Sequence, residues 1–182
     1  MKTTAIIILS TCLLALIVEY LVLKLKGKTK DAMLVQPLFA ISKNGFLGLV
    51  IGEAFDFVWA RITHLGLATQ KEMLDYKKDL EAMQMLGTGS KTIKVARKKF
   101  EEIDYISLGF DANNNLNSIM VYVNNKPNTM IKDYLMEIRD KYAKILGEPN
   151  MVNSDITYQW MFNGVMIVLF YANNQITLHI HN

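Results

Sequence analysis

Hydrophobic and polar positions follow three different patterns along the chain. One continuous apolar stretch runs from Ala5 to Leu23. Between 53 and 87, apolar residues recur about every 3.6 positions, which is typical of helices buried on one side. From 91 onward they mostly recur every second position, which is typical of strands with one buried face. The patterns therefore predict a membrane segment followed by an α+β domain.

Helices are expected at three places in this domain. The first covers 53–66, where the residues at helical spacing are Phe55, Val58, Trp59, Ile62 and Leu65. The second begins at Thr69, because Thr69 and Glu72 have the spacing of a capping box. The third runs from about Thr129 to Gly147, and its apolar side comprises Ile131, Tyr134, Leu135, Ile138, Tyr142, Ile145 and Leu146.

Strands are expected between and after these helices, with a short apolar one at 45–52. An antiparallel meander is predicted from 91–100, 104–110 and 116–123. The sequence DANNN joins the last two of these strands and favours a turn. Pairing of Asp111 with Leu116 across this turn would place Leu108 opposite Ile119 and collect aliphatic side chains on one face.

Two turn motifs fix the register of the C-terminal strands. Asn-Gly at 163–164 and Asn-Asn at 173–174 both suit two-residue hairpin turns, in which both residues have positive φ. The first turn pairs Trp160 with Ile167, and the second pairs Ile167 with Ile180. Both turns give the same apolar face, so two independent signals agree on the buried side of this sheet.

The opposite face of these C-terminal strands has an apolar centre with polar edges. Its predicted rows are Thr157, Phe170 and Thr177; Gln159, Val168 and His179; and Met161, Met166 and His181. We predict that Met161, Met166, Val168 and Phe170 form a contact surface for another protein or for a second copy of this chain. The alternative is that one of the protein's own helices, or its connector, covers these residues.

The N-terminal apolar segment is long enough to cross a membrane. Its nineteen residues cover roughly 28 Å of a hydrocarbon layer about 30 Å thick. Lysines follow at once without a small-residue cleavage site, which favours a retained signal-anchor over a cleaved export signal. The anchor residues are Ala5, Leu13, Glu19, Leu23, Lys24 and Lys26. The sequence thus predicts a single-pass protein of a bacterial inner membrane that contacts membrane lipids through this helix.

Several details of the anchor are left open by the sequence. Cys12, the only cysteine, follows Leu-Ser-Thr, so lipidation is an alternative to a membrane-buried thiol. Glu19 either makes an intramembrane contact or reaches the interface near Lys24. The lysines after the span favour a cytoplasmic domain, whereas an anchor this close to the N-terminus is common in exported bacterial proteins. The sequence therefore allows the domain to lie on either side of the membrane.

Length and charge fix the domain organisation and exclude one class of partner. The 182 residues divide into an anchor with a basic stem at 1–30, a connector at 31–44 and one domain at 45–182. The net charge is +3, and four lysines belong to the stem, so the domain is close to neutral. The most basic segment, 91–100, contains a single aromatic residue, so we expect no nucleic-acid partner.

Catalytic and metal-binding signatures are not found in the sequence. His179 and His181 could share a metal ion, but the only other histidine, His64, lies in the first predicted helix. No phosphate-binding loop, nucleophile elbow or Cys/His pair occurs. We therefore expect no enzyme, cofactor or metal, and predict a protein-binding or assembly module. The alternative function is binding of a lipid or other small hydrophobic ligand in a cavity walled by Trp59, Tyr134 and Trp160.

Two segments resemble a known class of bacterial envelope domain. GLVIGEAFDFVWARITHLGL resembles the short strand, glycine turn and helix of BLIP-like domains, which include the SmpA/OmlA-type small lipoproteins. MIKDYLMEIRDKYAKILGEP, followed by strands containing YQW, is similar to another half of such folds, with Leu146 in place of the usual aromatic residue. The resemblance covers 45–182. It implies helices packed on an antiparallel sheet, two related α/β halves and a role in envelope assembly through protein contact.

Overall fold

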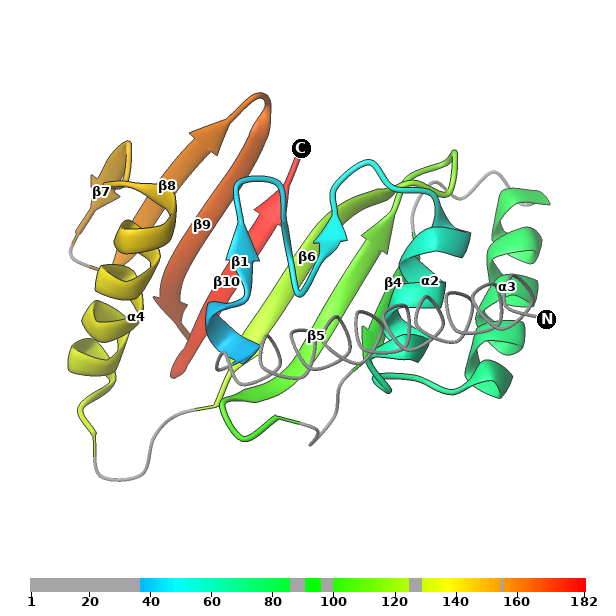
Figure 1. The fold of residues 1–182 in the computed structure, drawn as a ribbon, viewed down its shortest axis with the longest axis horizontal. Coiled ribbons are helices and arrows are strands. Elements are labelled where there is room, and N and C mark those ends of the chain that lie inside the picture. The colour runs from blue at the N-terminus through cyan, green and yellow to red at the C-terminus, as the bar shows by residue number, and fades with distance from the viewer. Residues whose placement is uncertain (1–36, 86–90, 96–99, 125–128, 155) are drawn as a thin grey trace, which may run out of the picture. The chain divides into compact units, whose positions relative to one another are not determined.

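The structure is a computed structural model that describes 37–85, 91–95, 100–124, 129–154 and 156–182 (Figure 1). The described residues all belong to one compact unit, Pro37–Asn182. This unit includes Pro37 to Asn44, which the sequence analysis assigns to the connector. All residues of the expected anchor lie outside the described part. Among the described helices, none combines the length and apolar character that a membrane crossing requires.

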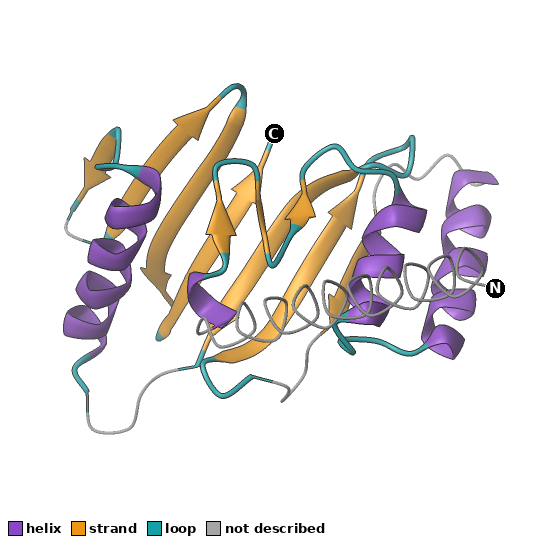
Figure 2. Ribbon diagram, viewed as in Figure 1, coloured by secondary structure: helices purple, strands orange, loops and turns teal. Residues whose placement is uncertain are grey.

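An antiparallel sheet of seven strands forms the body of this unit (Figure 2). Its strands are β4 (Lys91–Val95), β5 (Ile103–Phe110), β6 (Leu116–Val123), β7 (Met151–Asn153), β8 (Thr157–Phe162), β9 (Val165–Ala172) and β10 (Gln175–His181). The spatial order is β4-β5-β6-β10-β9-β8-β7. Two meanders, β4-β5-β6 and β8-β9-β10, thus meet where their last strands pair. The expected α+β architecture with an antiparallel sheet is confirmed.

The C-terminal hairpins have the predicted register. Trp160 lies opposite Ile167, and Ile167 lies opposite Ile180. The turn residues Asn163 and Gly164 have φ of 48° and 85°, and those at 173–174 have φ of 51° and 61°. Positive φ at both turn positions gives the hairpin a twist that matches the right-handed twist of its strands. The local sequence therefore determines this half of the sheet.

The pairing of β5 with β6 agrees with the prediction except beside the turn. Leu108 lies opposite Ile119, as expected, but Leu116 pairs with Phe110 and not with Asp111. Asp111 Oδ1 instead accepts hydrogen bonds from the backbone N–H groups of Asn113 and Asn115, both at 2.9 Å. Because this carboxylate organises the turn, the ladder shifts by one residue after Gly109. The predicted pairing of Asp111 with Leu116 is wrong.

A small ribbon and three α-helices complete the described part of the unit. The ribbon consists of β1 (Ile41–Ser42), β2 (Gly45–Phe46) and β3 (Leu49–Val50), and the short 3-10 helix η1 (Pro37–Phe39) precedes it. The α-helices are α2 (Phe55–His64), α3 (Gln70–Met85) and α4 (Ile131–Leu146). The single strand expected at 45–52 is wrong, because Leu47 and Gly48 both have positive φ and turn the chain back. The strand expected at 91–100 is described from Lys91 to Val95, and 96–99 lie outside the described residues.

The ribbon, α2 and α4 lie on the same face of the sheet (Figure 1). Their apolar side chains and the inward side chains of the sheet form one buried cluster. The ribbon covers the centre of this face, between the two helices (Figure 1). Tyr142 of α4 joins the parts, because its hydroxyl donates a buried hydrogen bond of 2.8 Å to the carbonyl oxygen of Leu38. Helix α3 packs beside α2, where the Tyr76 and Trp59 rings lie 5.5 Å apart.

Candidate functional site

The face of the sheet opposite α2, α4 and the ribbon is here named the outer face. Side chains alternate between the two faces along each strand, so the strand pairing assigns residues to it. The first row contains Lys94, Ser107, Met120, His179, Val168, Gln159 and Met151. The second contains Gly109, Ser118, His181, Met166 and Met161. The third contains Tyr105, Tyr122, Thr177, Phe170 and Thr157.

The four predicted contact residues lie together on this outer face. Met161 of β8 is directly opposite Met166 of β9, while Val168 and Phe170 follow Met166 along β9. The Met161 side chain is 58% exposed, and the other three are half-buried. The predicted register of these rows is confirmed. Their use as a contact surface stays a prediction.

A row of aromatic side chains extends the outer face beyond the predicted residues. The rings of Tyr105 and Tyr122 stack at 4.0 Å with an interplanar angle of 20°. Lys94 Nζ lies 4.9 Å from the centre of the Tyr105 ring, within the range of cation–π contacts. Burial is the main reason why the pKa of Tyr105 is raised above its ordinary value. The first meander therefore adds an aromatic and basic part that the sequence analysis did not assign to this site.

The two C-terminal histidines are neighbours on β10 and share the outer face, as predicted. Their ring centres are 4.4 Å apart, with an interplanar angle of 30°. Burial, and then the neighbouring His181, lower the pKa of His179 below its ordinary value of 6.5. Within the described ranges, no group of three or more histidine, cysteine, aspartate or glutamate residues is placed to hold a metal ion. The pair therefore has no third ligand among those residues.

Two small polar residues of the outer face are nearly inaccessible. Thr177 and Ser107 are each 5% exposed. Thr177 lies between Tyr122 and Phe170, and Ser107 lies between Lys94 and Met120. The cross-strand neighbours of both short residues thus have long side chains.

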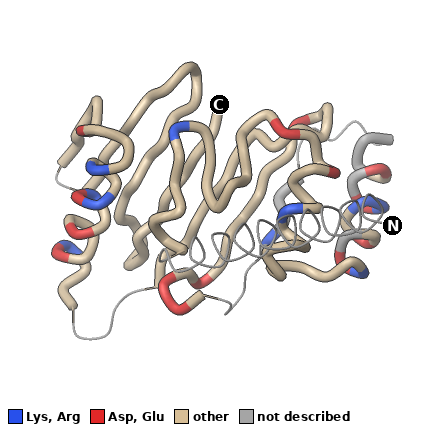
Figure 3. Tube along the Cα trace, viewed as in Figure 1, with Lys and Arg blue, Asp and Glu red and all other residues tan. Residues whose placement is uncertain are grey.

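Most charged residues lie outside the sheet strands. Figure 3 shows them mainly on α3, α4 and the connecting segments. None of the residues in the three rows of the outer face is an aspartate or a glutamate. Among the described strand residues, the one carboxylate is that of Asp104, which precedes Tyr105 and, after burial and Tyr122, contributes to raising the pKa of Tyr105. The rows thus carry basic groups at Lys94, His179 and His181 and no acidic ones.

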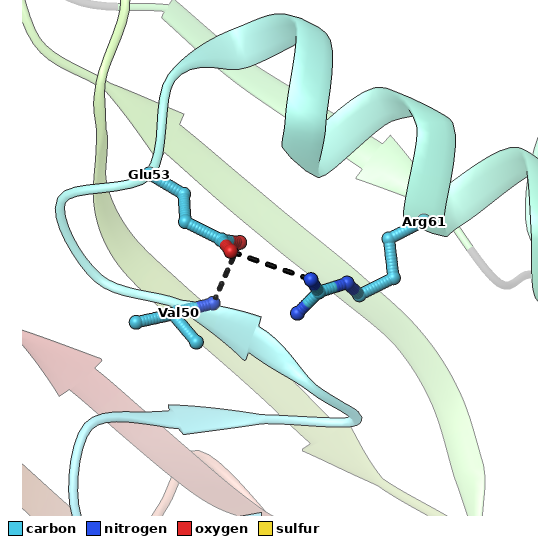
Figure 4. Close-up of polar contacts among 3 residues, drawn as sticks. All are labelled: Val50, Glu53 and Arg61. Carbon is cyan, nitrogen blue, oxygen red and sulfur yellow. Dashed lines mark hydrogen bonds and ion pairs between the residues drawn. The ribbon is translucent and has the colours of Figure 1, made fainter.

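Carboxylates near α2 have structural partners. Glu53 Oε2 accepts a hydrogen bond of 3.3 Å from the backbone N–H of Val50, and Oε1 lies 3.4 Å from a guanidinium nitrogen of Arg61 (Figure 4). Asp56 lies 3.7 Å from Lys77 Nζ of α3. Glu53 therefore joins the ribbon to α2, and Asp56 joins α2 to α3.

The aromatic residues expected to wall a ligand cavity lie in the core. Trp59 and Trp160 are fully buried, and Tyr134 is 2% exposed. Trp59 stacks on Phe55 at 5.7 Å, and Trp160 Nε1 donates a hydrogen bond of 2.7 Å to the carbonyl of Gly147. A pocket of about 150 Å³ lies elsewhere, and it is lined by Ala54, Phe55, Asp56, Lys77, Glu81, Asn113 and Asn114. The ligand-binding alternative stays a prediction.

Comparison of the chain with known protein families, characterised proteins and solved structures finds no match. Sequence reasoning found the C-terminal half of the outer face, because local turns fix its register. It missed Tyr105, Tyr122 and Met120, although their alternation with buried residues in β5 and β6 already places them away from the core.

Proposed function

We propose that this protein is a membrane-anchored, non-catalytic module that binds another protein through the outer face of its sheet. One observation carries the proposal. The ribbon, α2 and α4 lie against the opposite face, whereas no helix or ribbon of the described residues lies over the outer face (Figure 2). An exposed sheet face with an apolar centre and a polar margin is typical of protein contact surfaces.

The exposed apolar side chains of this face support the proposal. Met151 and Met161 are each 58% exposed, and the half-buried Met166, Val168 and Phe170 adjoin them. Methionine has a flexible, polarisable side chain that adapts to partners of different shape. Burial of such a surface against a partner would remove it from water and so favour association.

The membrane location and the assembly role rest on the sequence. The apolar segment from Ala5 to Leu23 would hold the module at a bacterial inner membrane as a single span. Each half of the sheet consists of a meander preceded by helix, which supports the proposal of two related halves. The resemblance to BLIP-like envelope domains supports envelope assembly as the process.

Substitution of two neighbouring residues on opposite faces of β9 tests this function. Phe170→Asp in the full-length chain should reduce the size of the complex extracted from membranes, with a small change in the thermal midpoint. Leu169→Ala, at a fully buried position, should instead cost about 2–5 kcal/mol of stability, because it leaves a cavity.

Either of two results would contradict the proposal. A folded Phe170→Asp variant that keeps the complex unchanged would exclude Phe170 from the contact. A loss of stability as large as that of Leu169→Ala would show that another part of the same chain covers Phe170, since burying an unpaired carboxylate is costly.

A further inference from the structure

The charges of the outer face restrict the partners that fit it. Lys94, His179 and His181 are its basic residues, and its rows contain no carboxylate. A second copy of the chain would bring the same basic groups against each other. A partner surface with carboxylates beside apolar side chains would match both the charge and the apolar centre.

The rows around the histidine pair contain no aspartate or glutamate among the described residues, and His181 Nδ1 lies 2.9 Å from the backbone oxygen of Asn182. On β6 the pair's cross-strand neighbours are Met120 and Ser118, and on β9 they are Val168 and Met166. One strand further out lie Ser107 and Gly109 on β5, and Gln159 and Met161 on β8. The phenols of Tyr105 and Tyr122 belong to the next row. Lys94 is three strands from His179, or roughly 14 Å at the usual strand spacing, and is of the same sign.

Protonation of His179 is therefore linked to what covers it. Burial and His181 hold the pKa of His179 below 6.5, so His179 is neutral at pH 7.5 in the free protein. A partner carboxylate beside the rings would favour the charged form and raise the pKa of His179. A partner that raises this pKa binds more tightly as the pH falls, because it prefers the protonated form. A purely apolar partner, or a second copy of the chain, would instead bind less tightly as the pH falls.

We infer that the outer face recognises a protein surface carrying carboxylates beside apolar side chains, and that protonation of His179, which lies beside His181, strengthens this contact. The inference rests on the proposed function and names the chemistry of the partner. It involves no covalent step.

Photo-cross-linking at two pH values tests the inference on the full-length chain in the membranes of the cells that make it. A benzoylphenylalanine replaces Gln159, which is beside Val168 on the outer face, and Lys144 on the exposed side of α4 serves as the control position. The yield of a protein adduct through position 159 should rise about 2- to 5-fold from pH 7.5 to pH 5.5, as expected for one exposed ion pair. Partner carboxylates remain largely ionised at pH 5.5.

Two further results are expected if the partner is acidic. The cross-linked partner peptide should contain aspartate or glutamate next to apolar residues. In the double variant H179Q/H181Q, the ratio of the yields at the two pH values should fall to about 1. Circular dichroism of the variant checks that it is folded.

The outcomes separate this inference from the function on which it rests. A protein adduct whose yield falls with acidification, or that joins two copies of this chain, would overturn the acidic partner and leave protein binding intact. An adduct with lipid alone would overturn both, because the face would then lie on the membrane. No adduct through position 159 at either pH would overturn the proposed function itself.

Discussion

At the scale of single residues, Tyr142 shows how the start of the domain is held. Its hydroxyl is buried and donates to the carbonyl of Leu38, 104 positions earlier in the chain. The Phe39 ring packs edge-on against the Tyr142 ring at 6.0 Å. Burial raises the pKa of Tyr142 well above its ordinary value, so this phenol remains a hydrogen-bond donor throughout the ordinary pH range. η1 is therefore part of the domain core.

Tyr142→Phe should lower the free energy of unfolding by about 1–3 kcal/mol, because the buried Leu38 carbonyl loses its donor. Urea denaturation followed by circular dichroism measures the change. Tyr171→Phe is the matched control. Its hydroxyl bonds to Asn174 at an exposed position, and its loss should change stability by less than about 0.5 kcal/mol. Equal effects of the two substitutions would mean that the Tyr142 bond contributes nothing beyond an exposed one.

At the scale of elements, the start of α3 follows from four residues of sequence. Thr69 N–H and the Thr69 hydroxyl both donate to Glu72 Oε2, at 2.6 Å and 2.8 Å, and Glu72 N–H donates to Thr69 Oγ1 at 3.3 Å. The predicted capping box is confirmed. The backbone and side-chain hydrogen bonds from Thr69 lower the pKa of the Glu72 carboxyl. The capping box therefore supplies hydrogen-bond partners for the polar groups at this helix end.

Thr69→Ala should cost about 1 kcal/mol of stability, since it leaves the first turn of α3 without its side-chain cap. Thermal denaturation compared with Thr129→Ala provides the check. Thr129 precedes α4, whose N-cap residue is Met130 and has no side-chain cap hydrogen bond, so this control should be nearly silent. If both alanine variants melt at the wild-type temperature, the capping box does not contribute to stability.

Elements with strong local signals were predictable, and those without them were not. The hairpin at 163–164 has Asn and Gly at the two positions that need positive φ, and apolar inward residues alternate with outward ones along β8 to β10. The ribbon turns at Leu47, a residue that seldom adopts positive φ, and its strands have two residues each. Neither alternation nor turn chemistry could reveal it, because its position depends on the core that it covers.

At the scale of the whole molecule, the pairing of β6 with β10 had no signal in the sequence. The paired residues Val121 and Leu178 are far apart in the chain, and either strand could also have been an edge. Both hairpins fix only local register, so they predict two meanders without saying how they join. The sequence therefore predicted an outer face of three strands, whereas this face in the structure extends over seven strands.

This junction makes one core out of two halves, and that has a measurable consequence. Leu178 and Ile180 of β10 lie opposite Val121 and Ile119 of β6, and all four side chains are fully buried. The core therefore continues from one meander to the other. We predict that the two halves unfold together in a single transition, because exposing either half would open the apolar surface of the other.

The two tryptophans of the chain allow this to be tested in each half separately. Trp160→Phe leaves only Trp59, beside Phe55 of the first half, and Trp59→Phe leaves only Trp160, beside Tyr142 of the second. In each variant, the urea midpoint from tryptophan fluorescence should coincide with that from far-ultraviolet circular dichroism of the same full-length protein. Comparison within one variant removes the stability cost of the substitution. Separate midpoints would show that the pairing of β6 with β10 joins two independently folding halves, each able to open its part of the outer face alone.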